Sequence, residues 1–422
     1  MKSRKISGFW EAGLLIFIFI YVYQTPIVPK IVYPLVELFI LLIFLLLRGQ
    51  KWMLIFSQLK MENALVALIV FLSMLRDGLS GEAVYIDRFL AWWFQAYIFG
   101  AVVVYFLVRY RPTGDEDFPR AVYITGVLSA CITLILYFSP SLDDYYKSIQ
   151  LDPYYELYSN FDLRYRAYGF SENLTFTYGY LLGVFAGYSL LKIEKNIFFI
   201  LPTVICLAGA ALNARIGFIS FFIFVLIHLC LGGSLKKTVK ILGSIFIFCG
   251  LFYILNIDIG EQGEWVAAFF KEFANFFASN NSSQDRGTFD LIFGSFIVWP
   301  DGISEWLFGS GRSLFLDERT NTDLGVFLQL NYAGMFFLLV ILIFSAYTSW
   351  RIFKIMTRRH WFPYIYTFSI FFLNFKGFLF AATPGGRLLF VLYAYYVIKK
   401  SRVDHKIRPA IDTGEKQKLL PV

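Results

Sequence analysis

Four arginines that border strongly apolar segments are the residues best suited to chemistry in this chain. Arg215 lies in the small-residue hairpin AGAALNARIG between two apolar runs, and Arg166, Arg286 and Arg312 lie in polar connecting stretches. A guanidinium group is a planar fork of donors that matches phosphate oxygens bidentately. Several such groups together would bind a phosphate or diphosphate. The alternative for Arg215 is a side chain that extends to the membrane surface, and for Arg286 and Arg312 it is a solvated loop charge.

Two carboxylates could accept a proton. Glu172 follows Gly169-Phe170-Ser171, and Asp323 follows Asn321-Thr322. Each could act as general base on an acceptor hydroxyl. Equally, each could be an acid that the helix dipole favours at a helix N-terminus.

Tyrosines and amides near Glu172 suit a sugar ligand. Tyr165 and Tyr168 end a stretch in which tyrosines alternate with carboxylates, and Asn173 follows soon after. The C–H faces of a sugar ring stack on aromatic rings, while its hydroxyls bond to acids and amides. The alternative is an aromatic belt at the membrane interface.

The composition shows what must position these residues. Hydrophobic residues make up 58% of the 422 residues and charged residues 16%, against about 45–50% and 25% in soluble domains. One compact core cannot hide that much apolar surface. All four cysteines fall inside apolar runs, so no disulfide framework is implied. The sequence therefore predicts a polytopic membrane protein, and a soluble enzyme, a disordered scaffold and a secreted disulfide module are excluded.

A window of about 20 residues, the length that crosses about 30 Å of hydrocarbon, predicts twelve membrane spans. The first is read as a retained span, because no small-residue cleavage site precedes Gln24-Thr25-Pro26. The predicted spans are 8–24, 31–47, 62–78, 89–108, 121–139, 173–191, 196–213, 216–231, 239–256, 323–349, 362–380 and 384–398.

The basic residues predict the orientation. Most of the 38 lysines and arginines lie at the N-terminus, in alternate short loops and after residue 398, which places both termini in the cytoplasm. The net charge of +8 is explained by these cytoplasmic basic residues, so no nucleic-acid partner is expected. Two long segments, 140–172 and 257–322, then lie outside, and long loops are usually functional. Residues 1–400 are predicted as one transmembrane domain and 401–422 as a disordered cytoplasmic tail.

This orientation excludes some chemistry. The three histidines, His228, His360 and His405, fall on the cytoplasmic side, so a histidine-based acid–base or metal site is not expected outside. The triplet Asp115-Glu116-Asp117 could suggest metal–nucleotide-sugar binding, but its short cytoplasmic loop favours a solvated turn. P-loop, G-x-S-x-G and H-E-x-x-H patterns do not occur.

Four stretches resemble the Wzy-type O-antigen polymerases of the O-antigen polymerase/ligase superfamily. The order and spacing of the motifs match from about residue 160 to 340, and the predicted number of spans matches over the whole chain. The stretches are Arg166–Asn173 (RAYGFSEN), Asn213–Gly217 (NARIG), Asp285-Arg286 with Leu307–Gly311 (LFGSG), and Thr322–Gly325 (TDLG) followed by Gly334.

The resemblance implies an all-α, GT-C-like fold of about twelve transmembrane helices in the bacterial inner membrane. It implies a metal-independent glycosyltransferase that polymerises undecaprenyl-diphosphate-linked repeat units on the periplasmic face, in the biosynthesis of O-antigen or a related surface polysaccharide. The growing chain moves from its lipid carrier onto an incoming unit. No cofactor, metal or nucleotide sugar is expected. The implied partners are the lipid-linked glycans, membrane lipid, a chain-length regulator and a flippase.

Carried over by position, Arg166, Arg215 and Arg286 match the arginines that bind lipid diphosphate in this family. The ligase branch has a periplasmic histidine where this chain reads Asn321-Thr322-Asp323, which favours a polymerase over an O-antigen ligase. The other alternative is a lipid-linked oligosaccharide flippase or transporter. A transporter typically has broken or charged helices in corresponding halves, whereas here the polar residues concentrate in two outer segments.

Overall fold

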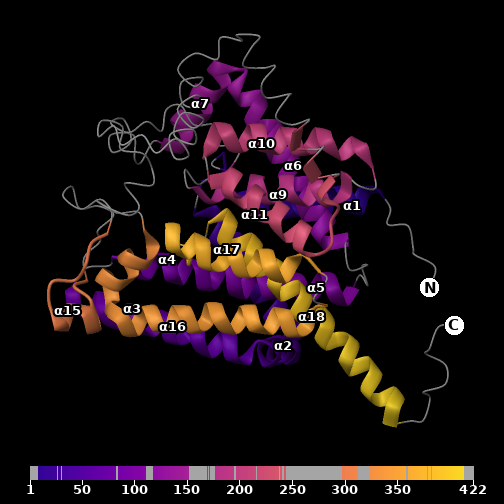
Figure 1. Cartoon of the computed structure of the whole chain (residues 1–422). Coiled ribbons are helices and arrows are strands. Elements are labelled where there is room, and N and C mark those ends of the chain that lie inside the picture. Colours follow the sequence, from indigo (N-terminus) through magenta and orange to yellow (C-terminus); the bar gives the residue numbers. More distant parts are fainter. Residues whose placement is uncertain are drawn as a thin grey trace, which may run out of the picture. The chain divides into compact units, whose positions relative to one another are not determined.

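The computed structural model of the chain contains only helices among the regular elements of its described part (Figure 1). The prediction of an all-α protein is confirmed for that part. The described residues are 8–25, 27–29, 31–81, 84–110, 117–151, 169, 171, 176–193, 196–214, 216–236, 238–239, 242–243, 297–311, 324–357, 360–377, 379–381 and 383–412.

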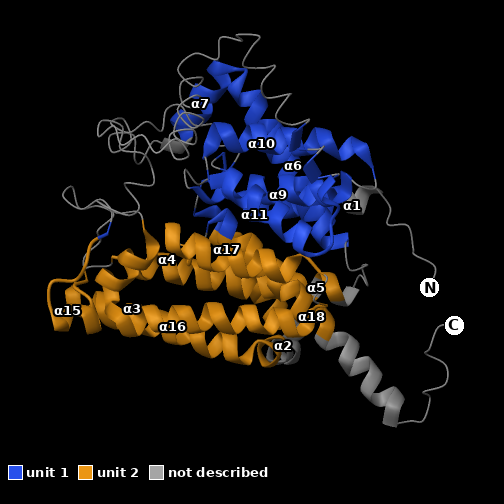
Figure 2. Cartoon of the chain, viewed as in Figure 1, with its two compact units in different colours: residues 1–33, 116–297, 383–385 blue, residues 34–115, 298–382, 386–422 orange. Residues whose placement is uncertain are grey.

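The chain divides into two compact units, and each is assembled from segments that are distant in the sequence (Figure 2). Unit 1 comprises residues 1–33, 116–297 and 383–385, and unit 2 comprises residues 34–115, 298–382 and 386–422. The first predicted outer segment, 140–172, therefore belongs to unit 1. The second, 257–322, passes from unit 1 into unit 2.

Unit 1 is built around helix α9, which contacts α6, α10 and α11. Gly179, Gly183 and Gly187 recur at every fourth residue of α9. A methyl group at Gly183 would lie 1.8 Å from the carbonyl oxygen of Gly217 in α11, so the two backbones touch, as small residues permit between membrane helices. The elements of unit 1 are α1 (Gly8–Tyr23), α6 (Asp117–Tyr137), α7 (Pro140–Leu151), α9 (Phe176–Ile193), the 3-10 helix η3 (Ile197–Phe199), α10 (Ile200–Asn213) and α11 (Ile216–Cys230).

Unit 2 is organised around helix α16, which contacts α3, α15 and α17. A π-helix, η1, interrupts the fourth predicted span. It buries Trp92, whose ring meets Phe344 and Phe380 edge-on at centroid distances of 5.7 and 5.0 Å. The elements of unit 2 are α2 (Val32–Gln58), α3 (Lys60–Ser80), α4 (Ile86–Ala91), η1 (Trp92–Phe99), α5 (Gly100–Tyr110), α15 (Ile303–Phe308), α16 (Gly325–Ile355), α17 (Phe362–Lys376) and α18 (Pro384–Asp412).

Several helices in the described part are suited to a membrane. Four segments are long and apolar enough to cross one: Lys60–Ser80, Ile86–Tyr105, Asp117–Tyr137 and Gly325–Ile355. Shorter apolar helices are Ala12–Tyr23, Val32–Leu46, Ile197–Asn213 and Ile216–Cys230. These helices indicate a membrane location. The total of twelve spans stays a prediction, and the ninth, 239–256, lies almost entirely outside the described residues.

Three helices extend at least about six residues beyond the predicted span ends. Helix α2 continues to Gln58, α16 to Ile355 and α18 to Asp412. The tail predicted to be disordered from residue 401 is thus helical as far as Asp412. A helix satisfies its own backbone hydrogen bonds and can continue beyond the hydrocarbon, so the hydropathy signal stops before the helix does.

Candidate functional site

All nine predicted site residues lie outside the described residues. The structure describes the chain directly next to several of them, and these neighbours are treated within each unit separately. The nine residues are Arg166, Arg215, Arg286 and Arg312 for diphosphate, Glu172 and Asp323 for proton transfer, and Tyr165, Tyr168 and Asn173 for sugar.

In unit 1, Gly169 directly follows the predicted sugar-binding residue Tyr168 in the sequence. Its φ is +56°, and a methyl group there would lie 2.6 Å from the Tyr178 hydroxyl and 2.9 Å from Thr133 Oγ1. The hydroxyls of Tyr178 and Thr133 form a 2.7 Å hydrogen bond, and Tyr178 also bonds with Ser129 Oγ at 2.8 Å. Glycine is required here for its left-handed backbone and its lack of a side chain, so the chain at Gly169 packs against a buried cluster of hydroxyl groups.

The predicted Arg215 is flanked by two buried residues, Ala214 and Ile216, which are 6% and 8% exposed. The amide of Gly217 donates to the Ala214 carbonyl at 3.0 Å. A methyl group on Gly179 of α9 would lie 2.8 Å from Ala214 Cβ. The turn between α10 and α11 is therefore packed tightly against α9 on both sides of Arg215.

In unit 2, helix α16 is broken at Gly334, whose φ of 80° and ψ of −175° are not helical. Such a break releases carbonyls of the preceding turn from their helical donors, and a buried carbonyl needs another donor. The carbonyls of Asn331 and Tyr332 accept from the amides of Ser310 and Gly311 at 2.7 and 3.0 Å. The turn before the predicted Arg312 is thereby fixed to the broken helix.

Asp77, near the C-terminal end of α3, holds the start of α4. Its Oδ2 accepts from the amides of Val84, Tyr85 and Ile86 at 3.0, 3.2 and 2.9 Å. Its Oδ1 accepts from the hydroxyl of Tyr332 at 2.6 Å. A carboxylate with four donors is a structural anchor, and it has little capacity left to accept a proton from a substrate.

Arg76 stands beside this anchor and was not identified from the sequence. It is half-buried, and its Nε has no hydrogen-bond partner in the part of the chain that the structure describes. A methyl group on Gly311 would lie 2.7 Å from its Nη2, so the guanidinium group lies against the glycine turn. The sequence does contain a signal for Arg76. It lies at the predicted outer end of span 62–78, where the positive-inside rule disfavours basic residues.

The predicted base Asp323 directly precedes Leu324, which is fully buried at the N-cap of α16. A methyl group on Gly325 would lie 2.2 Å from the Asn374 carbonyl oxygen, so this end of α16 abuts the end of α17. Nearby, the side-chain amides of Gln329 and Asn374 bond to each other at 2.5 and 3.3 Å. Buried amides of this kind fix the register of two apolar helices.

A separate polar cluster joins α3, α16 and α18. Glu62 is completely buried, and its Oε1 accepts from both Arg351 and Tyr393. Arg351 also donates to the backbone oxygen of Gln58. The distribution of basic residues predicts Arg351 to be cytoplasmic, and the sequence does not indicate its partner, which is 289 positions away.

Helix α7, in the first predicted outer segment, holds an ion pair between Asp143 and Lys147, with 2.5 Å between Oδ2 and Nζ. Burial raises the pKa of the Asp143 carboxyl, and the lysine only partly offsets this. This pair was not identified from the sequence, although an acid and a base four residues apart along a helix are typical of one.

No protein-family model, curated protein or solved structure in the comparisons matches the chain. Within the described residues, no three His, Cys, Asp or Glu side chains come together as a metal site. The candidate site is therefore defined by its geometry alone. It lies in unit 2 and consists of the Arg76 guanidinium group against the turn at Gly311, with Asp77, whose carboxylate already accepts four hydrogen bonds, as the next residue.

Proposed function

We propose that the chain is a multi-pass glycosyltransferase of the bacterial inner membrane that polymerises undecaprenyl-diphosphate-linked repeat units on the periplasmic face, as its resemblance to Wzy-type polymerases implies. The observation that carries the proposal is Arg76, whose guanidinium group lies against Gly311 at the end of α3 that the charge distribution predicts to be outside. A half-buried cation whose Nε has no hydrogen-bond partner among the described residues suits an anionic ligand such as a diphosphate.

The sequence supplies a candidate for a second cation. Arg312, one of the predicted diphosphate residues, is the residue after Gly311. Arg312 lies outside the described residues, and we propose that its guanidinium group binds the same diphosphate as that of Arg76. Two arginines approaching one diphosphate from α3 and from the second outer segment would neutralise it without a metal.

The proposed reaction is a displacement at a sugar carbon. A hydroxyl of the incoming unit attacks the anomeric carbon of the growing chain, and the bond from that carbon to the diphosphate oxygen breaks. The diphosphate leaves on its lipid with the bonding electrons, and the hydroxyl proton passes to a base. Arginines placed where this charge develops would lower the barrier. Glu172 and Asp323 remain the proposed bases, since Asp77 is already saturated with donors.

A second candidate function is a lipid-linked oligosaccharide flippase. The break of α16 at Gly334 favours it, because transporters commonly build their substrate sites from interrupted helices. The π-helix Trp92–Phe99 is a further irregularity of a kind that often occurs at functional sites.

The test uses the purified full-length protein in liposomes with a synthetic lipid-linked repeat unit. We expect a ladder of products that differ by one unit. Arg76→Gln should reduce the ladder about a hundredfold, the loss typical of one charge-stabilising donor, and Arg76→Lys should restore part of it. Arg120→Gln is the control, because Arg120 is an exposed arginine at the predicted inner end of α6.

The same liposomes separate the two candidates. Transfer of a fluorescent lipid-linked unit between leaflets, without any laddering, would replace the polymerase with the flippase. Ladders of equal yield from Arg76→Gln and the native protein would remove Arg76 from the proposed site.

A further inference from the structure

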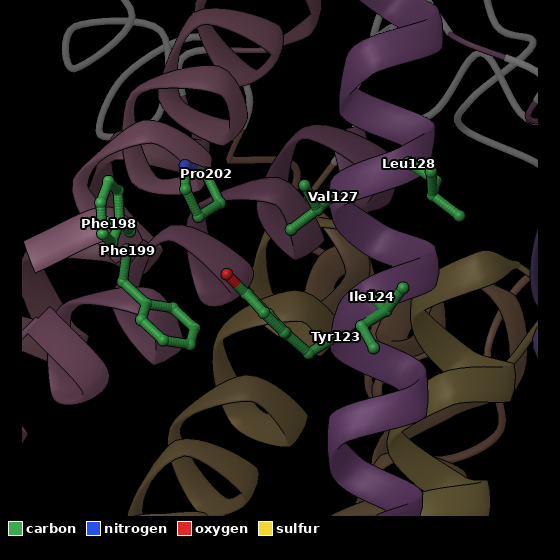
Figure 3. A pocket seen from close by; sticks show the side chains of 7 residues that line it. All are labelled: Tyr123, Ile124, Val127, Leu128, Phe198, Phe199 and Pro202. Carbon is green, nitrogen blue, oxygen red and sulfur yellow. The ribbon is translucent and has the colours of Figure 1, made fainter. Parts of the chain in front are cut away.

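Unit 1 contains an apolar groove between α6 and the segment formed by η3 and α10 (Figure 3). Its volume is about 330 Å³, at the lower end of the range for small-molecule sites. The lining residues are Tyr123, Ile124, Val127, Leu128, Phe198, Phe199 and Pro202.

The floor and the rim of the groove differ in exposure. Tyr123 is buried, and its hydroxyl forms a 2.7 Å hydrogen bond with Ser189 Oγ, so its one polar atom is satisfied by α9. Leu128 and Phe198 at the rim are 47% and 82% exposed. An open groove with so little polar lining suits a hydrocarbon chain better than ordered water, which needs polar partners.

The ammonium group of Lys192 lies near the groove, separated from the lining residue Tyr123 by the ring of Tyr188. Lys192, in the last turn of α9, places Nζ 5.0 Å from the ring centroid of Tyr188. The Tyr188 ring in turn lies 5.0 Å from that of Tyr123. The distribution of basic residues predicts this end of α9 to be cytoplasmic, where anionic lipid headgroups attract lysine.

We propose that this groove binds one acidic phospholipid of the cytoplasmic leaflet, with an acyl chain between α6 and η3–α10 and the phosphate at Lys192. The charge of Lys192 favours an anionic headgroup, and the apolar lining favours a hydrocarbon chain. The proposal does not rest on the glycosyltransferase function, whose residues are predicted at the opposite ends of the helices.

The test is native mass spectrometry of the full-length protein in detergent, titrated with phosphatidylglycerol or phosphatidylethanolamine of identical chains. We expect phosphatidylglycerol to bind more tightly. Lys192→Gln should reduce that preference about fivefold, the contribution of one lysine near a charged surface. Val127→Trp should fill the groove and weaken binding of both lipids. Melting temperatures of the variants check that each remains folded.

Matched controls come from the same chain. Lys354 lies 5.1 Å from the Trp350 ring in unit 2 with the same four-residue spacing, so Lys354→Gln should leave lipid binding at this groove unchanged. Ile135→Trp introduces the same side chain at an exposed position of α6 that does not line the groove. Equal losses from Lys192→Gln and Lys354→Gln, or from the two tryptophan variants, would overturn the proposal. Displacement of phosphatidylglycerol by undecaprenyl phosphate at equal concentration would also overturn it, by assigning the groove to the prenyl chain.

Discussion

Arg351 on α16 donates a hydrogen bond to Glu62 on α3, although 289 positions separate them in the sequence. Glu62 is completely buried, whereas the Arg351 side chain is 20% exposed. An ion pair of this kind contributes little net stability relative to apolar residues, but removing one partner leaves the other charge uncompensated. The pair therefore specifies how α3 and α16 align.

The first prediction concerns this pair. Glu62→Gln should lower the free energy of unfolding by about 3 kcal/mol, because Arg351 loses its countercharge. The measurement is thermal or denaturant unfolding of the purified protein in detergent. Asp144→Asn, at an exposed acid, should change it by less than about 0.5 kcal/mol. Glu62→Leu combined with Arg351→Met should be less destabilised than the sum of the two single changes, and simple additivity would show that the two residues are not coupled.

The second prediction concerns the contact between α9 and α11. Gly183→Ala should destabilise the protein by about 2–3 kcal/mol, because the new methyl group would lie 1.8 Å from a backbone oxygen that cannot rotate away. Gly13→Ala, in helix α1 with nothing within 4 Å, should instead be neutral or stabilising by about 0.5–1 kcal/mol. Both follow from melting curves, and a Gly183→Ala protein as stable as Gly13→Ala would contradict the close approach of the helices.

The third prediction concerns the start of α4. Asp77→Asn replaces one acceptor oxygen by a donor, so the amides of Val84, Tyr85 and Ile86 and the hydroxyl of Tyr332 lose part of their partner. We expect faster hydrogen exchange in residues 84–86 and a loss of about 2 kcal/mol in stability. The exposed Asp301, changed to Asn, is the control. Unchanged exchange in residues 84–86 would show that the carboxylate is not the anchor.

The fourth prediction concerns the turn beside Arg76. Gly311→Ala places a methyl group at a φ of +75° and against the Arg76 guanidinium, so it should cost about 1–2 kcal/mol of stability. It should also displace the guanidinium group and reduce polymerisation about tenfold. Gly302→Ala is matched to it, because Gly302 has an extended φ of −144° and no atom within 4 Å. Equal activity of the two variants would show that Arg76 does not contribute to the reaction.

The fifth prediction concerns Arg215. Arg215→Ala should abolish polymerisation while expression stays normal, because its neighbours Ala214 and Ile216 keep the turn packed. Product length is read from the ladder assay. Arg120→Ala, at an exposed arginine of α6, is the control. Polysaccharide of normal length from Arg215→Ala would defeat the assignment of Arg215 to the diphosphate.

Several features of the site could be predicted from the sequence, and others could not. The glycines at 169, 309, 311 and 334 all lie in motifs picked out for their order and spacing, and each has a positive φ in the structure. By contrast, the sequence sets Arg76 apart only as an arginine at a predicted outer span end, and its contact with Gly311 is visible only in the tertiary structure. Its sequence neighbours are an apolar helix and an aspartate, and neither indicates a ligand.

Apolar composition and helical hydrophobic runs determined by themselves that this protein is all-α and suited to a membrane, because lipid allows only segments that satisfy their own backbone hydrogen bonds. Local patterns also located most helix cores, since hydropathy is summed over neighbouring residues. Only the tertiary structure decided that Glu62 pairs with Arg351 and that Asp77 is a structural anchor whose oxygens are already occupied by donors. Likewise, only the tertiary structure showed that the amides of Ser310 and Gly311 bind the carbonyls released by the break in α16. These pairings join residues far apart in the chain, and nothing in the local sequence encodes which distant group will satisfy a buried charge or a released carbonyl.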